Sequence, residues 1–600
     1  MRTSTLRELA RQYSIETSYT DAAGKRQQAS KRALMAAIDA RRRGAAGFGP
    51  AADRGLKAAA PPVRVAWGNQ RLEVDGEWDL ELEDGSWRSG RGPQSLEPLP
   101  PGYHTLRRKD GHETLIIAAP MKAYAPRKKS WGIFTPLYAA RTRRSWGAGD
   151  LGDLLQYASW VDHHRGSVVA TLPMLAGFDD EPSPYSPHSR LFWNELYLDA
   201  TRLPEFRPED ADLGTIAHLQ QTPRVDYDAV SREKRRVLQR CAARFVPDGE
   251  YEEFARGEAG EYARFRGDET YHLYVQYRLA QQMREVANAA RRFGAGLYLD
   301  FPLGVNSGGY DAHRYAHVFA NGVSVGAPPD LFFTKGQSWG FAPFDPDAIR
   351  ADRYQYFRKA VRQHVAHAGI LRIDHVMGLH RLFWIPEGLS PADGVYVRYN
   401  SEELYAILTL ESRRHGCTVV GEDLGTVPPE VPKSMARHGL RRMYVVQYEI
   451  KPNEPIPQPP AASVASINTH DMPPFAAWWA GRDIDDRVSQ GLLDEVGAHR
   501  ERDTREQMRR TTGAHDVKTA LESLLMFLAE SDAEIVLINI EDLWGELEPQ
   551  NVPGVPERSW RQKLRLGLEA AMADGSIRRV LTNVNDRRAS PLLQQETKEG

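Results

Sequence analysis

Three short apolar runs of this sequence end in a carboxylate, and a fourth is followed after one residue by a His-Asp pair. Charged side chains are costly in a protein interior unless they pair with one another or take part in chemistry. Carboxylates at the ends of four separate runs therefore predict a catalytic site. The residues concerned are Asp300, Arg372, Asp374, His375, Glu422, His470 and Asp471.

Two carboxyl groups in different environments suit glycosyl transfer with retention of configuration. One carboxylate attacks the anomeric carbon, and a second, protonated carboxyl about 5–5.5 Å away donates to the leaving oxygen. Asp374 is short, and Arg372 two residues earlier on the same strand face would keep it ionised, as a nucleophile requires. Glu422 has the longer reach of a general acid, and the like charge of Asp374 would raise its pKa.

Asp471 is the candidate for a third role, the stabilisation of an oxocarbenium-like transition state, and His375 and His470 would add hydrogen bonds. Two other interpretations stay open. The charged groups could be ion pairs that close a barrel, or metal ligands, because His-Asp pairs are also ligand types. A metal-dependent barrel hydrolase favours His-x-His at an early strand end, whereas the first two runs end in Thr-Pro-Leu and Leu-Pro-Met.

Two loops could hold a sugar chain beside these carboxylates. The loop SPYSPHSRLFWNELYLD presents a tyrosine between two prolines, and a rigid aromatic suits stacking on a sugar face. The loop GAPPDLFFTKGQSWGFAPFDP concentrates aromatics beside polar groups. A packed turn tyrosine and core aromatics that cap a barrel are the alternative interpretation. The candidate contacts are Tyr185, Asp330, Gln337 and Trp339.

Eight short apolar runs must position these residues, and amphipathic stretches lie between several of them. Continuous apolar runs are typical of parallel strands covered by helices, and eight strand-helix units predict a (β/α)₈ TIM barrel, an α/β fold. The C-terminal strand ends of such a barrel meet at one mouth, where catalysis takes place. The runs are 132–137, 167–172, 296–300, 370–374, 418–422, 443–447, 464–468 and 534–539.

The first 125 residues predict two smaller units. Residues 1–60 are rich in Lys and Arg and predict a helical extension with a Gly-, Ala- and Pro-rich linker. Residues 61–125 contain short alternating runs between turn signals, which predict a small β-sandwich-like module. We expect its three tryptophans to form the core of that module. They are Trp67, Trp78 and Trp87.

The barrel itself is expected over residues 126–585. More than 120 residues separate its second and third runs, so the sequence predicts an inserted helical subdomain at about 175–295. Residues 586–600 are polar and predict a loose tail. The fold class is therefore a barrel with large insertions, preceded by a helical segment and a β module.

The composition excludes several classes of protein. The 600 residues include 78 Lys and Arg and 80 Asp and Glu, so no strong field attracts nucleic acid or a membrane surface. No apolar run of about 18 residues predicts a membrane span, and the start lacks a secretory h-region. The two cysteines exclude a disulfide framework and a Cys-rich zinc site, and they predict a cytoplasmic protein.

Six segments in order resemble the signature of the 4-α-glucanotransferases, the amylomaltase or disproportionating-enzyme family, glycoside hydrolase family 77. The segments span about residues 130–565, and YTDAAGKRQQAS near the start resembles the extension of bacterial members. The segments are SPYSPHSRLFWN, GAPPDLFFTKGQSWG, LRIDHVMGL, VVGEDLG, SINTHDMPP and IEDLWGELEPQNVPG.

The resemblance implies Asp374 as nucleophile, Glu422 as acid/base and Asp471 as transition-state stabiliser, in agreement with the roles argued from chemistry. It also implies disproportionation, in which a segment of an α-1,4-glucan passes through a covalent intermediate to the 4-hydroxyl of another glucan or of glucose. No cofactor or metal is implied. The implied substrate contacts are Tyr185, Asp300, Asp330, Gln337, Trp339, Arg372, His375 and His470.

Three places depart from the commoner family pattern, namely Leu331 after Pro-Pro-Asp, Phe341-Ala342 after Trp-Gly, and Gly308-Gly309 in a shortened segment. They leave acceptor preference and the formation of cyclic glucans open. An α-glucan hydrolase with the same two-step chemistry, a metal-dependent hydrolase and an inactive glucan-binding protein are the alternatives to a transferase. The sequence predicts neither the oligomeric state nor the role of the first 125 residues.

Overall fold

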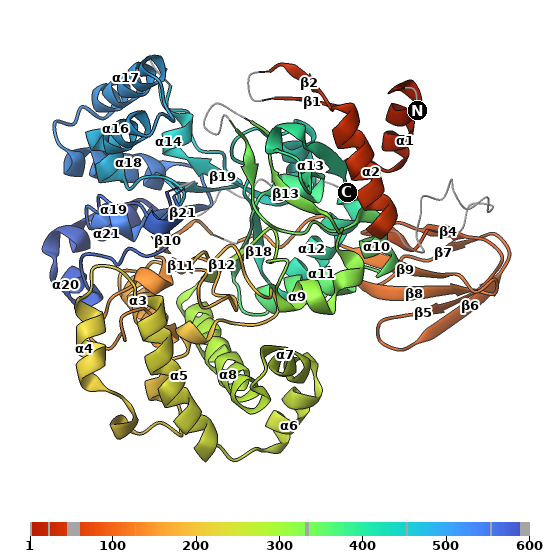
Figure 1. Cartoon of the computed structure of the whole chain (residues 1–600), viewed down its shortest axis with the longest axis horizontal. Coiled ribbons are helices and arrows are strands. Elements are labelled where there is room, and N and C mark those ends of the chain that lie inside the picture. The colour runs from red at the N-terminus through yellow and green to blue at the C-terminus, as the bar shows by residue number, and fades with distance from the viewer. Residues whose placement is uncertain are drawn as a thin grey trace. The chain divides into compact units, whose positions relative to one another are not determined.

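The computed structural model describes residues 3–21, 24–44, 61–126, 128–329, 335–451, 454–552 and 555–588. Eight strands close into a barrel in the order β10-β11-β12-β15-β18-β19-β20-β21 (Figure 1). Each strand overlaps one of the eight apolar runs, so the predicted (β/α)₈ barrel is confirmed. The strands are β10 (Ser130–Phe134), β11 (Val168–Ala170), β12 (Gly296–Phe301), β15 (Ile370–Ile373), β18 (Thr418–Gly421), β19 (Arg441–Val445), β20 (Ser463–Ser466) and β21 (Ile535–Asn539).

Burial explains why these strands are continuous apolar runs. Every residue of β11, β12, β15, β18, β20 and β21 is buried, so neither face alternates with polar residues. Strands β10 and β19 are the exceptions, because Phe134 and Met443 are only partly buried and Arg442 is exposed.

The chain divides into two compact units. Unit 1 comprises Met1–Ala125, Phe301–Ala366 and Ile373–Arg441, and unit 2 comprises Pro126–Asp300, His367–Arg372 and Arg442–Gly600. Each unit is described by itself below. The predicted domain boundaries at residues 60, 125 and 585 stay predictions.

In unit 1 the N-terminal segment packs on a four-stranded sheet of order β14-β13-β16-β17. Leu6, Leu34 and Ile38 share one apolar core with Trp384 and other residues of that sheet, and Trp339 packs against the same core. The segment therefore supports the sheet that contains the predicted substrate contact Gln337, and Trp339 follows the strand β14 of that sheet. Its elements are α1 (Thr3–Gln12), β1 (Ser18–Thr20), β2 (Arg26–Gln28) and α2 (Lys31–Gly44), and the sheet consists of β13 (Val323–Ala327), β14 (Gln337–Ser338), β16 (Arg381–Pro386) and β17 (Val395–Arg398).

A five-stranded sheet of order β3-β9-β8-β5-β6 and the pair β4-β7 form the predicted β module. Trp78 lies in its core, as expected, but Trp87 is 54% exposed, so the expectation for Trp87 is wrong. The reason is that Trp87 begins the edge strand β6, most of whose residues face solvent. Trp67 is partly buried and stacks on His438 with ring centroids 4.5 Å apart. The strands are β3 (Val63–Trp67), β4 (Leu72–Val74), β5 (Glu77–Glu81), β6 (Trp87–Arg91), β7 (Gln94–Leu96), β8 (Gly102–Arg108) and β9 (Glu113–Ala119).

The remaining helices of unit 1 follow its barrel strands or its sheet. Helix α12 packs on β3 and β9, and α11 packs on α12. These helices are α9 (Tyr310–Arg314), α10 (Pro346–Ala351), α11 (Gln355–Val365), α12 (Ser401–His415) and α13 (Glu430–His438).

Unit 2 contains a group of helices between β11 and β12. The 25-residue helix α8 packs against α3, α5 and α7, as Figure 1 shows. The helices up to β12 are α3 (Leu151–His163), α4 (Leu213–Gln221), α5 (Tyr227–Arg244), α6 (Gly249–Arg256), α7 (Glu258–Arg266) and α8 (Glu269–Phe293). The later ones are α14 (Val446–Glu449), α15 (Phe475–Ala480), α16 (Arg482–Ser489), α17 (Glu495–Thr512), α18 (Val517–Glu530), α19 (Ile540–Leu543), α20 (Leu568–Ala573) and α21 (Gly575–Arg588).

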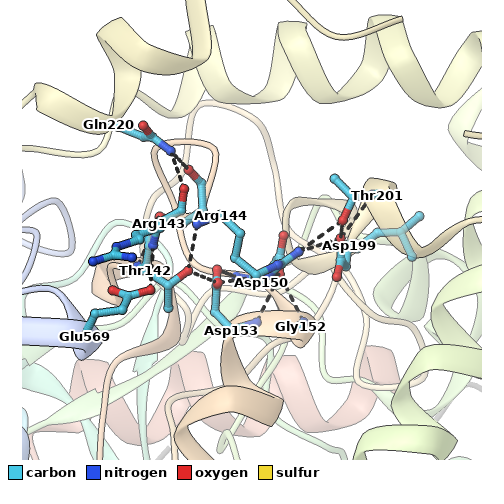
Figure 2. A network of polar contacts seen from close by, with 12 residues as sticks. Thr142, Arg143, Arg144, Asp150, Gly152, Asp153, Asp199, Thr201, Gln220 and Glu569 are labelled. Carbon is cyan, nitrogen blue, oxygen red and sulfur yellow. Dashed lines mark hydrogen bonds and ion pairs between the residues drawn. The ribbon is translucent and has the colours of Figure 1, made fainter. Parts of the chain in front are cut away.

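A buried ionic network fixes the loop between β10 and α3 in unit 2 (Figure 2). Arg144 contacts Asp150, Asp153 and Asp199 at 2.7, 2.9 and 2.6 Å, and the three aspartates are buried. Asp150 is also the N-cap of α3 and forms a capping box with Asp153. The network therefore ties the start of α3 to the segment around Asp199.

In the portion of the chain with described coordinates, no helix is both long enough and apolar enough to cross a membrane. Both cysteines, Cys241 and Cys417, are buried, and neither belongs to a disulfide bond.

Candidate functional site

Two of the predicted catalytic carboxylates, Asp374 and Glu422, belong to unit 1 and directly follow the neighbouring barrel strands β15 and β18. The N–H of Glu422 donates to the carbonyl of Ile373 at 3.0 Å, and its carbonyl accepts from the N–H of Val376 at 3.0 Å. The backbone of Glu422 is therefore hydrogen-bonded to one residue before Asp374 and to one residue after it. Because neighbouring strands lie about 4.7–4.9 Å apart, the two side chains start from adjacent positions.

The Glu422 carboxylate is held by two backbone donors. Oε2 accepts from the N–H of His375 at 3.0 Å, and Oε1 accepts from the N–H of Leu424 at 2.7 Å. His375 has a φ of 48°, a left-handed conformation that costs energy for a residue with a side chain. The strained backbone of His375 thus supplies one of the two N–H groups that hold the Glu422 carboxylate.

Trp339 and Gln337 belong to the same cluster of unit 1. The Trp339 ring meets the His375 ring edge-on, with centroids 5.4 Å apart, and Trp339 Nε1 donates to Gln337 Oε1 at 3.2 Å. Both side chains are only partly buried. The predicted contact Asp330 lies outside the described residues.

Unit 2 contains a second cluster, which begins with a buried ion pair. Arg372 Nη1 donates to both carboxylate oxygens of Asp300, at 2.8 and 2.7 Å, and both residues are buried. Tyr185 donates its O–H to Asp300 Oδ2 at 2.6 Å. From the sequence we expected the Arg372 guanidinium to keep Asp374 ionised, and within unit 2 it is bound by Asp300.

The same cluster continues from Tyr185 to Asp471. Tyr185 Oη lies 2.8 Å from His470 Nε2, and the two rings stack with an interplanar angle of 17°. His470 Nε2 lies 3.2 Å from Asp471 Oδ2. Because the Tyr185 O–H is directed to Asp300, the network assigns the proton to His470 Nε2, which then donates to Tyr185 and Asp471.

Asp471 is the exposed end of this chain of contacts. Its side chain is 49% exposed, and its Oδ1 accepts from Asn551 Nδ2 at 2.8 Å. Partial burial acts to raise the pKa of the Asp471 carboxyl, but His470, Asn551 and Arg372 outweigh it and hold that pKa below its ordinary value. The result is an ionised carboxylate with a face open to a ligand.

Sequence reasoning missed three members of the second cluster, one of which is Phe134, whose ring stacks on that of His470 with centroids 5.8 Å apart. Asn551 contacts Asp471, and the Trp560 ring lies 5.8 Å from that of Tyr185 and 6.0 Å from that of His470. Trp560 also has a left-handed φ of 60°. Asn551 could have been found in the segment IEDLWGELEPQNVPG, but no comparable signal marks Trp560.

The structure thus groups the predicted residues in two clusters. Unit 1 holds Asp374, Glu422, His375, Trp339 and Gln337, and unit 2 holds Arg372, Asp300, Tyr185, His470 and Asp471. The first cluster offers adjacent carboxyl groups for nucleophilic and acid/base chemistry. The second offers a carboxylate held ionised beside a histidine. Over the described ranges, no group of three or more His, Cys, Asp or Glu residues is arranged to hold a metal ion.

Comparisons with known proteins agree over most of the chain. The model of the 4-alpha-glucanotransferase family matches residues 135–269 and 261–569. The 4-alpha-glucanotransferase of Mycobacterium tuberculosis is 31% identical over an alignment of 724 residues, which covers 98% of this chain and 97% of that protein. The 4-alpha-glucanotransferase of Haemophilus influenzae is 26% identical and covers 82% of this chain, with 85% of its own length aligned.

Two solved structures of amylomaltases are also similar to this chain. Amylomaltase from Corynebacterium glutamicum superposes with a TM-score of 0.86 at 26% identity, and the match covers 97% of this chain and 100% of that one. Amylomaltase from Streptococcus agalactiae in complex with acarbose matches with a TM-score of 0.64 at 17% identity, over 77% of this chain and 100% of that one. The second match is a likeness of fold.

Proposed function

Since this chain belongs to the 4-alpha-glucanotransferase family and is an enzyme of that type, we propose that it disproportionates maltooligosaccharides by a retaining double displacement. The resemblance predicted from the six sequence segments is confirmed by the same comparisons. The proposed donor is an α-1,4-glucan, and the proposed acceptor is the 4-hydroxyl of another glucan or of glucose.

In the first step of the proposed reaction, a carboxylate oxygen of Asp374 attacks the anomeric carbon of the donor. The glycosidic bond breaks as Glu422 gives its proton to the leaving oxygen, and the donor segment becomes an ester of Asp374. In the second step, Glu422 takes the proton of the acceptor hydroxyl, which attacks the same carbon and displaces Asp374. Two inversions retain the α configuration.

The observation that carries this proposal is the position of Glu422 opposite Asp374. Hydrogen bonds of 3.0 Å on both sides of Asp374 fix the backbone of Glu422 there. A third bond, from the N–H of Asp374 to the carbonyl of Phe301 at 3.1 Å, fixes the backbone of the nucleophile. Catalysis by positioned groups depends on such fixed starting points.

The environment of Glu422 suits a group that must act both as acid and as base. The N–H donors of His375 and Leu424 favour its ionised form, and the nearby negative charge of Asp374 favours its neutral form. A general acid/base must gain and lose a proton in each catalytic cycle, and we propose that these opposed influences serve that role.

We assign Asp471 to the stabilisation of the oxocarbenium-like transition state. Its pKa is held low by His470, Asn551 and Arg372, so it stays ionised through the reaction and its negative charge opposes the positive charge that develops on the sugar ring. The proposed substrate contacts are Tyr185, Asp300, Asp330, Gln337, Trp339, Arg372, His375 and His470.

The acarbose complex of the Streptococcus agalactiae amylomaltase supports an oligosaccharide-like ligand for this fold. We propose glucans and glucose as the partners of this chain, with no nucleic acid or membrane surface among them. A cytoplasmic location, as the cysteine usage predicts, and a part in glycogen or maltodextrin metabolism belong to the same proposal.

Chromatography of maltotriose digests tests the proposed activity. A transferase produces glucose together with a ladder of longer maltooligosaccharides, whereas a hydrolase produces new reducing ends without longer products. A chelator distinguishes a metal-dependent hydrolase, because it would abolish that activity. Asp374→Asn is expected to abolish turnover, and an undiminished rate in this variant would show that Asp374 is not the nucleophile.

A further inference from the structure

Glu541 and Asp542 are two buried carboxyl groups without a role in the proposed reaction. They follow β21 at the start of α19, and each is only 5% exposed. Burial raises the pKa of Glu541 to about 8 and that of Asp542 to about 6. Burying a carboxyl is unfavourable unless its hydrogen bonds offset the cost, so the contacts of both residues indicate what they do.

Asp542 closes the turn that carries His470 and Asp471. Its Oδ1 accepts from Asn468 Nδ2 at 3.1 Å and from the N–H of Phe475 at 2.6 Å. Asn468 follows β20, and Phe475 begins α15. One carboxylate oxygen from the neighbouring strand end therefore holds both ends of the turn.

Other contacts of Asn468 keep that end of the turn in place. Asn539, the last residue of β21, donates from Nδ2 to the carbonyl of Asn468 at 3.3 Å. Asn468 Nδ2 also reaches the carbonyl of Pro473 at 3.3 Å. Both asparagines are buried, so the start of the turn is held by buried hydrogen bonds, while Asp471 is half exposed.

Asn551, which donates to Asp471, is held in place by a separate set of contacts. Gln550 precedes Asn551 and donates from Nε2 to Glu541 Oε1 at 2.9 Å. Its carbonyl accepts from the N–H of Trp560 at 2.6 Å, and its side chain also binds Tyr138. Because Asn551 is held in this way, the 2.8 Å bond from Asn551 to Asp471 depends on where the turn places Asp471.

We propose that Asp542 is a positioning residue for Asp471, which it aligns by holding Asn468 and Phe475 at the two ends of the turn. This inference rests on the proposed function, because it takes Asp471 to act on the transition state. Small displacements of a group that acts in the transition state reduce turnover more than they reduce ground-state binding. Asp542 therefore contributes to kcat without contacting the substrate.

The test compares Asp542→Ala with Asp542→Asn in the full chain, with maltotriose as substrate. Alanine removes the acceptor, so kcat is expected to fall about 100-fold with KM within about threefold of wild type. Asparagine keeps an amide oxygen that can accept from Asn468 and Phe475, so kcat is expected to stay within about threefold of wild type. Asp516→Ala is the matched control, because Asp516 accepts from two backbone N–H groups of α18 in the same unit.

A purely structural role for Asp542 predicts a different result. Asp542→Ala would then resemble Asp516→Ala, with a lower melting temperature but an unchanged kcat per folded molecule, and the proposal would be overturned. Loss of kcat in Asp542→Asn as large as in Asp542→Ala would also overturn it, because the acceptor is retained in the asparagine variant.

The pH profile gives a second readout. In Asp542→Ala, Asp471 loses the contacts that lower its pKa, so the acid limb of kcat/KM is expected to move upward, towards the ordinary aspartate range of about 4. An unmoved limb would contradict the proposal. If Asp542→Ala does not fold, Asn468→Ala replaces it, with an expected loss of about tenfold in kcat, and an unchanged kcat there overturns the proposal.

The wild-type digest separates this inference from the proposed function. If wild type forms no ladder from maltotriose, the proposed transferase activity itself fails. If wild type forms the ladder and Asp542→Ala forms it at the same rate, only the positioning role of Asp542 fails.

Discussion

The backbone N–H of His375 donates a 3.0 Å hydrogen bond to Oε2 of Glu422, so the residue after the proposed nucleophile holds the proposed acid/base. This contact uses the backbone of His375, whose φ of 48° is left-handed. The conformation of one residue therefore couples the ends of β15 and β18. It also means that a substitution at 375 acts through backbone strain as well as through the lost imidazole.

Substitutions at His375 are expected to separate these two effects. Asparagine tolerates left-handed φ, whereas β-branched valine is strained there by roughly 1–3 kcal/mol. We therefore expect His375→Val to have a lower melting temperature and a kcat about tenfold below that of His375→Asn. Calorimetry and initial rates on maltotriose measure both quantities. Equal kcat values for the two variants would show that the backbone conformation does not matter for Glu422.

Glu422→Gln is expected to stop protonation of poor leaving groups. A positioned general acid contributes about 10²–10⁴-fold, so turnover of maltotriose should fall by about that factor. An α-maltosyl fluoride donor needs no proton on its leaving group, and its first step should be much less affected. The release of fluoride measures that step. If fluoride donor and maltotriose lose activity to the same extent, Glu422 is not the acid.

Arg372→Ala is expected to destabilise the fold strongly, because it leaves the buried Asp300 carboxylate without its cation. Breaking a buried pair by removing one partner costs about 3–5 kcal/mol. Removing both partners in Arg372→Ala/Asp300→Ala should recover part of that loss. Urea unfolding of the four proteins measures the coupling. Additive losses in the double variant would mean that the 2.7 and 2.8 Å contacts contribute no coupling free energy.

Arg372 also affects the pH profile of the proposed reaction. Its charge helps to lower the pKa of Asp471, so Arg372→Ala should raise that pKa and move the acid limb of kcat/KM upward. From the sequence we expected Arg372 to keep Asp374 ionised, so the loss of Arg372 would also move an acid limb that is set by Asp374. Combining Arg372→Ala with Asp471→Asn distinguishes the two, because a limb that still shifts in the double variant belongs to Asp374.

The fold could be predicted from the sequence because the barrel strands are buried on both faces. Continuous apolar runs such as those of β12 and β21 identify such strands without any alternation to interpret. The edge strand β6 shows where prediction of burial from the sequence fails. Its Trp87 is 54% exposed, and no local pattern distinguishes a tryptophan on an edge from one in a core.

Only those residues of the candidate site that lie at the ends of barrel strands could be predicted from local sequence patterns. Asp300 lies near the end of β12, and Asp374 and Glu422 directly follow β15 and β18, so each could be predicted from its place at a strand end. The bond from Asn551 to Asp471 spans 80 positions of the chain, and that from Arg372 to Asp300 spans 72. Such pairings are decided by tertiary packing, so spacing along the sequence does not reveal them.

The network around Arg144 predicts a pH dependence of stability that is separate from the reaction. Burial and the neighbouring charge of Asp150 raise the pKa of Asp153 to about 7. Burial opposes ionisation of Asp150 as well, but Lys234 and Arg144 outweigh it and lower the pKa of Asp150. Of the three aspartates in Figure 2, Asp153 and Asp199 therefore keep their protons to a higher pH than exposed aspartates do, whereas Asp150 loses its proton at a lower pH.

A carboxyl whose pKa is higher in the folded state stabilises the fold at low pH, and that contribution is lost as the pH rises through the folded value. For Asp153 the loss should fall between about pH 4 and pH 7. The free energy of unfolding of wild type minus that of Asp153→Asn should therefore decrease over this interval by an amount on the order of a few kcal/mol.

Urea unfolding of both proteins at about pH 4, 5, 6 and 7 measures this difference. Asp516→Asn is the control, because Asp516 is exposed and its pKa is lowered by hydrogen bonds from Thr519, so its contribution should be constant over the same interval. Asp153→Asn also loses an acceptor for the N–H of Asp150. This loss changes the free energy of unfolding by the same amount at every pH, so it does not alter the pH dependence of the difference. A difference between wild type and Asp153→Asn that stays constant from about pH 4 to 7 would mean that Asp153 is ionised in the folded protein throughout, and that Arg144 outweighs both burial and Asp150.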